Sequence, residues 1–288
     1  MSPVFRSVVL TLEMIKFQHT LFALPFAFLA AFTAANGVPK GWTIVWILCA
    51  MVGARSAAMA FNRLVDAHID AANPRTETRA LPAGLVSRNF VILFVLASAS
   101  LFFYAAYRLN PLAFALSPVA MAIILGYSFT KRFTSLSHLV LGLALAIAPA
   151  GAWIAVRGEI DFRVLPLAIA VLFWTAGFDT LYSLQDIEFD RNARLFSIPA
   201  AVGPKRALTI ARLFHVVTLM ALAAYGIVNG FGVAYFAGVG AATVLVVWQH
   251  TIISPSDLSR INAAFFTANG VLSIVLFALG ACDILIRP

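Results

Sequence analysis

Long runs of apolar residues alternate with short polar breaks along the whole of this chain. Nine runs are long enough to cross the hydrocarbon core of a bilayer, which takes roughly 20 helical residues. They cover about 17–36, 41–62, 88–108, 111–128, 137–157, 162–183, 207–228, 231–250 and 262–284. Backbone amides in lipid must be satisfied within the segment, so each run is predicted to be an α-helix.

The composition identifies lipid as the solvent. The chain is 62% hydrophobic and only 11% charged, whereas soluble proteins have about 45–50% apolar and about 25% charged residues. We therefore predict an all-α polytopic membrane protein with about nine transmembrane helices. The polar breaks are short and no linker interrupts them, so residues 1–288 are predicted to form a single domain.

The distribution of Lys and Arg predicts the orientation in the membrane. Of the 20 basic residues, fourteen fall in segments that would share one side, together with the long loops 63–87 and 184–206. This bias predicts an inner (cytoplasmic) membrane protein with its amino terminus and long loops in the cytoplasm and its carboxyl terminus outside. The net charge of +8 then reflects this bias and a surface of anionic lipid, so no nucleic-acid partner is needed. No obligate protein partner is evident. Five residues would lie on the other side: Lys40, Arg108, Arg157, Arg163 and Arg287.

The scarce acidic residues gather at the ends of two predicted helices. Asn62, Asp66 and Asp70 are spaced at i, i+4 and i+8, which places them on one face of a helix. Like charges at this spacing repel, so the arrangement costs stability unless a positive group lies between them. We call this set the first acidic motif.

A second acidic motif occupies the sequence GFDTLYSLQDIEFD. On a continuous helix, Asp179, Tyr182, Asp186 and Asp190 share a face. Two acidic faces at the same membrane depth indicate a pair of divalent cations, and Mg²⁺ prefers hard oxygen ligands such as carboxylates and phosphates. The amide oxygen of Asn62 suits the same set of ligands. The alternative is that these acids simply contact water at the helix ends.

Arginines follow both acidic motifs. Guanidinium groups match the geometry of phosphate oxygens, so these residues are candidates to bind a diphosphate; for each, positive-inside topology is the alternative. Arg55 differs because it lies about two turns deeper, inside a predicted membrane helix, where a charge usually marks a functional interior. It either anchors a substrate carboxylate or pairs permanently with Asp179. The candidates that follow the motifs are Arg75, Arg79, Arg191 and Arg194.

A third cluster, GYSFTKR, lies where the fourth predicted helix ends. Tyr127 and Ser128 offer hydroxyl groups, and Lys131 and Arg132 offer positive charges to the same cavity. An interfacial tyrosine with basic residues that extend toward the membrane surface is the alternative interpretation.

These motifs resemble those of a known family. NRLVDAHID and DTLYSLQDIEFD are similar to the two aspartate motifs of the UbiA-type aromatic prenyltransferases, and the second is most like the 4-hydroxybenzoate polyprenyltransferase branch. IKFQHT and NPRTETRALPAG also resemble relatives proposed to prenylate a dihydroxynaphthoate on the route to menaquinone. The resemblance implies nine helices around a central cavity that opens to lipid. It implies metal binding by Asn62, Asp66, Asp70, Asp186 and Asp190, and roles around the diphosphate and acceptor for Arg55, Tyr127, Ser128, Lys131, Arg132 and Asp179.

The expected reaction is Mg²⁺-dependent transfer of a polyprenyl group from polyprenyl diphosphate to an aromatic acceptor. The expected acceptor is 4-hydroxybenzoate, in ubiquinone biosynthesis, and the alternative is a dihydroxynaphthoate, in menaquinone biosynthesis. Asp179 is the candidate base for the ring proton, and a displaced diphosphate oxygen is the alternative. The competing class is a membrane transporter, since intramembrane charge also fits one. The clustering of charge at one mouth, rather than at the midplane, favours the enzyme.

Overall fold

The computed structural model describes residues 10–11 and 20–287, and every long element in this part of the chain is a helix. The start of the first predicted run, at residue 17, lies outside the described residues. The long helices are α2 (Thr20–Ala35), α3 (Gly41–Val65), α5 (Arg88–Leu109), α6 (Pro111–Thr130), α7 (Ser137–Arg157), α8 (Leu165–Tyr182), α11 (Pro204–Val228), α12 (Val233–Thr251) and α13 (Asn269–Ile286).

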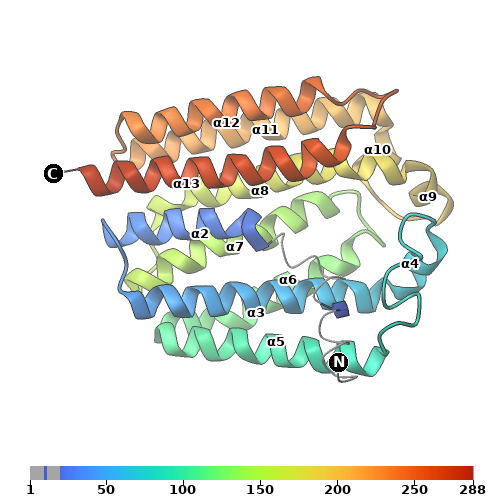
Figure 1. Ribbon diagram of the computed structural model, residues 1–288, viewed down its shortest axis with the longest axis horizontal. Helices are drawn as coiled ribbons and strands as arrows, with labels where there is room; N and C mark the ends of the chain where they lie inside the picture. Colours follow the sequence, from blue (N-terminus) through green and yellow to red (C-terminus); the bar gives the residue numbers. More distant parts are fainter. Residues whose placement is uncertain (1–9, 12–19, 288) are drawn as a thin grey trace.

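Short helical segments occupy the connections. A 3₁₀ turn, η2 (Phe162–Val164), precedes α8, and a π-helix, η4 (Ala263–Ala268), precedes α13. The remaining short segments all lie at one end of the molecule, at the right in Figure 1. They are α4 (Ala67–Ala72), η3 (Ser183–Asp186), α9 (Ile187–Asn192) and α10 (Ile198–Val202).

The helices have the lengths and composition of membrane spans. Within the described residues, eight helical segments are long and apolar enough to cross a membrane, and Phe22–Ala35 forms a shorter apolar helix. The prediction of an all-α membrane protein with about nine such helices is therefore confirmed.

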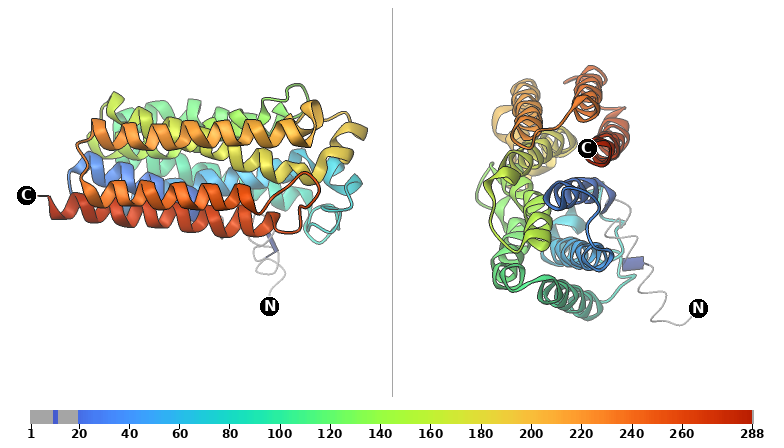
Figure 2. Two further views of the ribbon diagram at one scale, coloured as in Figure 1. Left: turned by 90° about the horizontal axis from the view of Figure 1, so that it is seen from above. Right: turned by 90° about the vertical axis from the view of Figure 1, so that its left-hand side faces the viewer.

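The long helices run side by side and follow one another around the molecule (Figures 1 and 2). Neighbouring pairs run from α3 through α5, α6, α7 and α8 to α11, α12 and α13. Helix α2 packs against α13 at one end of this series, contacts α3 at the other end, and also packs against α7. The two long charged loops, residues 63–87 and 184–206, lie at a single end of the bundle.

The main hydrophobic core lies between α2, α8 and the carboxyl-terminal helices. Trp174 is fully buried in it, packs on Phe26 with ring centroids 4.9 Å apart, and donates its indole N–H to Asn269 Oδ1 at 2.9 Å. Burial of an aromatic side chain supplies a large apolar contact area, and the hydrogen bond satisfies its one polar atom. This packing fixes α8, which carries Asp179, the first aspartate of the second acidic motif.

Polar side chains complete helix ends on the side opposite the motifs. Asn110 accepts a hydrogen bond from the amide of Ala113 at 2.9 Å and donates to the carbonyl of Ile154 at 2.8 Å, which joins α6 to α7. Asp283 accepts from the amides of Gly232 and Tyr235 at the start of α12. Such bonds satisfy backbone groups that a helix leaves unpaired at its ends.

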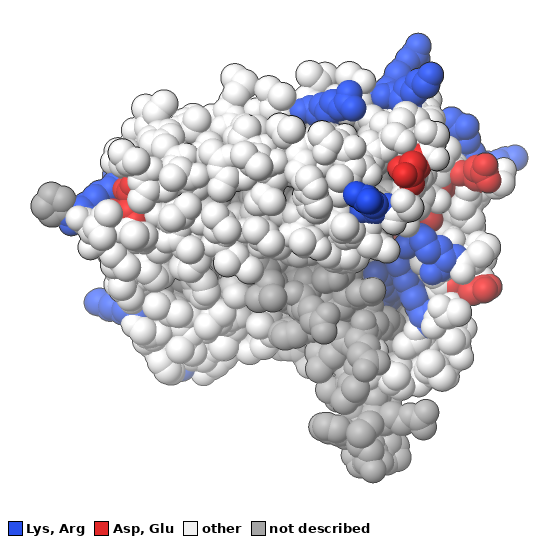
Figure 3. Space-filling model, turned by 45° about the horizontal axis from the view of Figure 1, so that its top comes forward, with Lys and Arg blue, Asp and Glu red and all other residues white. Residues whose placement is uncertain are grey.

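The surface separates by polarity as a membrane requires. In Figure 3 the middle of the molecule is almost free of charged side chains, and most of the visible charges gather over the end formed by α4, α9 and α10. Large apolar side chains are exposed on the outer faces of the helices, for example Leu93 at 64% and Val244 at 68%. Exposed apolar surface on this scale is compatible with lipid and not with water.

The contact between α7 and α8 gives a test of the packing. A Cβ on Gly142 would clash with the backbone carbonyl group of Leu172, whereas a Cβ on Gly151, in the same helix, would meet nothing within 4 Å. Gly142→Ala is therefore expected to cost about 1–3 kcal/mol through overpacking and to lower the apparent melting temperature in detergent. Gly151→Ala is the matched control and should leave it unchanged or raise it. Equal melting temperatures for the two variants would contradict the close approach of α7 to α8.

Candidate active site

A pocket of about 340 Å³ opens at the charged end of the bundle. Its lining comes from six parts of the chain: α2, the end of α3 with the loop after it, the end of α6, the first half of α7, the segment from α8 to the start of α10, and the π-helix η4. Both acidic motifs face it although more than a hundred residues separate them. The predicted site residues in its lining are Arg55, Asn62, Asp66, Asp70, Arg75, Arg79, Tyr127, Ser128, Lys131, Asp179, Asp186 and Asp190.

The first acidic motif spans a bend rather than one straight helix. Helix α3 ends at Val65, and Asp66 separates it from α4. The backbone bonds from Asp66 N to Asn62 O and from Asp70 N to Asp66 O continue across the bend at 2.9 and 2.8 Å. The four-residue spacing therefore keeps all three side chains at the pocket.

Asp66 is 1% exposed and is neutralised by residues of the third cluster. Its carboxylate accepts hydrogen bonds from Lys131 Nζ at 2.6 Å, Arg132 Nη2 at 2.8 Å and Asn62 Nδ2 at 3.0 Å. A buried carboxylate is tolerated only when it is paired in this way. The expected repulsion within the motif is thus relieved by cations from the end of α6.

Asp179, Tyr182, Asp186 and Asp190 all line the pocket, as a common face predicts, but they do not belong to one continuous helix. Helix α8 ends at Tyr182, and the 3₁₀ turn η3 carries the chain to Asp186 before α9 begins. A 3₁₀ turn has three residues per turn instead of 3.6, so it changes the direction of the side chains that follow. Asp179, Asp186 and Asp190 still reach the pocket lining.

A residue from the first loop holds the second motif. Arg75 Nε and Nη2 bind the two oxygens of Asp186 at 2.9 and 2.6 Å, and Asn73 Nδ2 donates to Asp186 Oδ1 at 3.1 Å. Burial lowers the pKa of Arg75, but the hydrogen bonds and charge of Asp186 outweigh it and hold that pKa above its ordinary value. Sequence reasoning missed Asn73; an Asn before Pro is a turn signal, and here its Oδ1 accepts from the amide of Arg75 at 2.9 Å.

The other predicted phosphate-binding arginines divide into two groups. Arg79 lines the pocket and donates to Asp70 Oδ1 at 2.7 Å. The structure leaves Arg191 and Arg194 out of the pocket lining, and both are exposed. Arg191 Nε instead donates to the carbonyl of Ala200 at 3.0 Å, because α9 directs it toward α10.

Arg55 has no ionic partner among the described residues. The proposed alternative of a permanent pair with Asp179 is wrong, because Asp179 Oδ2 lies 2.7 Å from Nδ1 of His138. The guanidinium Nε of Arg55 is buried without a hydrogen-bond partner in the described structure. His138 was not singled out from the sequence, since no ligand-type spacing pointed to it.

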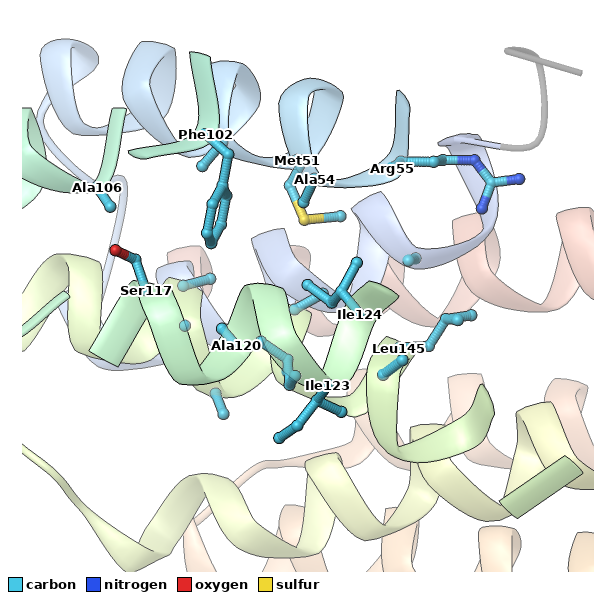
Figure 4. A pocket seen from close by; sticks show the side chains of 18 of the residues that line it. Met51, Ala54, Arg55, Phe102, Ala106, Ser117, Ala120, Ile123, Ile124 and Leu145 are labelled. Atoms are coloured by element: carbon cyan, nitrogen blue, oxygen red, sulfur yellow. The ribbon is translucent and has the colours of Figure 1, made fainter. Parts of the chain in front are cut away.

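A second, apolar pocket of about 350 Å³ adjoins the charged one. It lies between α3, α5, α6 and α7, and Arg55 and Tyr127 line both pockets. Figure 4 shows Arg55 at one end, with Ala106 and Ser117 at the other and Met51, Phe102 and Ile124 between them. A ligand with a charged head and a long apolar tail matches this pair of pockets.

The donor set fits a cation that a phosphate ligand completes. No group of three His, Cys, Asp or Glu side chains within the described residues is close enough to hold a metal ion alone. Mg²⁺ usually takes one or two carboxylates together with phosphate oxygens and water. Asp70 Oδ2 is buried without a hydrogen-bond partner, with Arg63 Nη1 3.8 Å away, so one carboxylate oxygen is available.

Comparison with known proteins gives consistent matches. A family model described as the UbiA prenyltransferase family matches residues 23–271. A 4-hydroxybenzoate octaprenyltransferase of Nitrosospira multiformis is 30% identical over 254 residues, which are 88% of this chain and 87% of that protein. One from Vibrio cholerae is 33% identical over 245 residues, 84% of this chain and 85% of that one.

Solved structures share the fold. The apo structure of a UbiA homolog from Aeropyrum pernix K1 matches with a TM-score of 0.85 at 33% identity, over 93% of this chain and 98% of that chain. A UbiA homolog from Archaeoglobus fulgidus, bound to DMAPP and Mg²⁺, matches with a TM-score of 0.74 at 20% identity, over 96% and 99%.

The unpaired Arg55 predicts a gain in stability on its removal. A buried charge without a partner costs free energy, so Arg55→Met should raise the apparent melting temperature of the ligand-free protein by about 2–4 °C for each kcal/mol gained. Arg75→Met is the control, because it removes the ionic partner of Asp186 and should lower the melting temperature. A lower melting temperature for Arg55→Met would show that the guanidinium has a stabilising partner after all.

Proposed function

Because this chain belongs to the UbiA prenyltransferase family, we propose that it transfers a polyprenyl group from its diphosphate to a ring carbon of 4-hydroxybenzoate, in quinone biosynthesis. One observation carries the proposal. Two acidic motifs with their basic partners line a charged pocket that adjoins an apolar one, and an unpaired arginine stands between them.

The charged pocket binds the diphosphate. Arg75, Arg79 and Lys131 line it, and each already donates to a carboxylate at 2.6–2.9 Å. These cations are held in place before the substrate arrives, so less conformational entropy is lost when they bind it. Guanidinium groups are well suited to bind two phosphate oxygens at once.

Mg²⁺ is the proposed cofactor, and Asn62, Asp66, Asp70, Asp186 and Asp190 are its proposed ligands. The Archaeoglobus fulgidus homolog, with the same fold, was solved with DMAPP and Mg²⁺. When bound, the metal supplies charge stabilisation for the diphosphate as it leaves. The carboxylates and the amide of Asn62 supply the hard oxygens that this ion prefers.

The apolar pocket receives the prenyl tail. Its lining is formed mostly by Ala, Ile, Leu and Met side chains, and Ser117, Arg55 and Tyr127 are its polar members. Val119 of α6 lines it and is 60% exposed, which supports an opening toward lipid on this side. A tail of many isoprene units is itself lipid-soluble and can remain partly in the bilayer while its head reaches the charged pocket.

The acceptor binds at the junction of the two pockets. Arg55 is free to pair with a carboxylate there, and Tyr127 and Asp179 lie in the lining of the charged pocket. A carboxylated phenol such as 4-hydroxybenzoate has a carboxylate that can pair with Arg55 and a phenol ring that can be prenylated. The relatives at about 30% identity are named for this acceptor. A dihydroxynaphthoate carries the same two groups and is the alternative acceptor.

The residues of the chain perform three tasks in the reaction. Arg75, Arg79 and Lys131 stabilise the negative charge that grows on the diphosphate as its bond to the allylic carbon breaks. The apolar walls exclude water from the carbocation, which would otherwise be hydrolysed. The ring carbon forms the new carbon–carbon bond, and Asp179 accepts the ring proton.

The charged end of the bundle faces the cytoplasm in this proposal, and the carboxyl terminus lies outside the inner membrane. Support comes from the excess of Lys and Arg at that end of the molecule (Figure 3), since basic residues are retained on the cytoplasmic side.

Reconstitution with a panel of acceptors tests the function. Purified protein in liposomes is incubated with Mg²⁺, radiolabelled polyprenyl diphosphate, and 4-hydroxybenzoate, a dihydroxynaphthoate or phenol. We expect 4-hydroxybenzoate to be prenylated, and Asp66→Asn and Asp190→Asn to reduce turnover by about 10²-fold or more while remaining folded in detergent. Arg55→Met should reduce the preference for 4-hydroxybenzoate over phenol.

The outcomes separate the parts of the proposal. Full Mg²⁺-dependent turnover in both aspartate variants would contradict the assignment of the acidic motifs. Preferential prenylation of the dihydroxynaphthoate would show that the acceptor is not 4-hydroxybenzoate, while prenyl transfer itself would be supported. Movement of a solute across the liposome membrane without any prenylated product would favour a transporter.

A further inference from the structure

His138 lies at the start of α7, where both nitrogens of its ring are hydrogen-bonded. The side chain is buried, with 3% of the residue exposed. Nδ1 lies 2.7 Å from Asp179 Oδ2, and Nε2 accepts a hydrogen bond from the backbone amide of Ile198 at 3.2 Å. The ring therefore connects the deep aspartate of α8 to the first residue of α10.

These two contacts determine which nitrogen carries the proton. A backbone N–H only donates, so Nε2 must present its lone pair to Ile198. In the neutral ring the proton is then on Nδ1, which donates it to Asp179. The imidazole cannot take a second proton at Nε2 without losing the bond to Ile198.

The contact with His138 also makes the two carboxylate oxygens of Asp179 different from each other. Oδ2 accepts the proton of His138 in a hydrogen bond, whereas Oδ1 accepts no hydrogen bond from the described residues. The side chain of Asp179 is 28% exposed and lines the charged pocket. One oxygen is held by the protein, and the other remains free to meet a ligand.

We propose that His138 is a positioning residue: it fixes Asp179 so that Oδ1 faces the acceptor ring and receives the ring proton. The inference rests on the proposed function and names how its base is oriented. As the allylic C–O bond breaks and the ring carbon–carbon bond forms, the proton passes from the ring carbon to Oδ1, and its C–H electron pair restores aromaticity. The proton stays on Asp179, because His138 has no free lone pair to pass it on.

A purely structural role for His138 predicts different behaviour. Ile198 follows Ser197, whose Oγ donates to Asp190 Oδ2 at 2.7 Å. If His138 acted only by anchoring this segment through the amide of Ile198, its loss would disturb Asp190 and weaken binding of Mg²⁺ and diphosphate. A loss confined to the rate of proton removal would not follow from such anchoring.

Two substitutions separate the two contacts. Asn at position 138 can place its Nδ2–H where Nδ1–H lies and so donate to Asp179, but it does not reach Ile198. Gln can place its Oε1 near the position of Nε2 and accept from Ile198, but it has no donor at the position of Nδ1. His138→Asn thus keeps only the hydrogen bond to Asp179, and His138→Gln keeps only the hydrogen bond from Ile198.

The experiment measures single-turnover rates with saturating substrates and, separately, the affinity for an unreactive prenyl thiodiphosphate with Mg²⁺. We expect His138→Ala and His138→Gln to be slower by about 10²-fold, at the low end of the contribution of a positioned base, with unchanged affinity for the analogue. His138→Asn should recover most of the rate. In an Asp179→Asn background, His138→Ala should lower the rate little further, because both substitutions remove the same function, the oriented base.

Ser197→Ala serves as the control, because Ser197 contacts Asp190 and not Asp179. Ser197→Ala should weaken binding of the analogue with Mg²⁺ and have less effect on the saturated rate. Recovery by Gln instead of Asn, or a loss of affinity in place of rate, would overturn the proposal and make His138 an anchor of α10. Histidine-selective ¹⁵N NMR of the full protein tests the assignment without turnover: a His138 signal protonated at Nε2 would overturn it, even if the acceptor panel revealed no prenyl transfer.

Discussion

Buried carboxylates at the charged end of the bundle are neutralised by basic side chains of the loop after α4 and of the end of α6. Asp66 and Asp70 are almost fully buried, and they are paired with Lys131 and Arg79 at 2.6 and 2.7 Å. Removing one partner of a buried pair typically costs about 3–5 kcal/mol, because the remaining charge has lost both water and its counter-ion. With the pair of Arg75 and Asp186 at 2.6 Å, three distant segments are therefore held together at one end of the bundle by charge.

Under the proposed function, the same pairing would prepare the site for its ligands. A diphosphate would compete with Asp186 for Arg75, and a divalent cation would compete with Arg75 for Asp186. If both ligands bind, every charge exchanges one partner for another and none remains unpaired in a region of low dielectric. If only one binds, it displaces a cation or a carboxylate that then has no new partner. The two ligands are therefore expected to bind cooperatively.

Much of the fold was predictable from the sequence because lipid imposes a simple rule. Every span must satisfy its own backbone, so apolar runs such as 137–157 predicted the helix Ser137–Arg157 without error. The spacing of Asn62, Asp66 and Asp70 also predicted their common direction, since i→i−4 bonds continue through the bend after Val65. Local periodicity is sufficient for such features.

The parts that failed depend on tertiary contacts. The sequence pattern of the second acidic motif does not predict the 3₁₀ turn at Ser183–Asp186. This turn forms where the chain leaves the packed end of α8. The partner of Asp179 is His138, 41 residues away on another helix, so sequence spacing gave no reason to choose it over Arg55. Asn73 likewise acquires its role only because the loop after α4 folds onto Asp186.

Whether Mg²⁺ and diphosphate bind cooperatively can be measured by calorimetric titration of Mg²⁺ into the detergent-solubilised protein. The titration is made with and without an unreactive prenyl thiodiphosphate. We expect weak binding of Mg²⁺ alone and an affinity at least about tenfold higher with the analogue, a coupling of about 1.4 kcal/mol. Equal affinity for Mg²⁺ in both titrations would contradict the exchange of partners at the charged pocket.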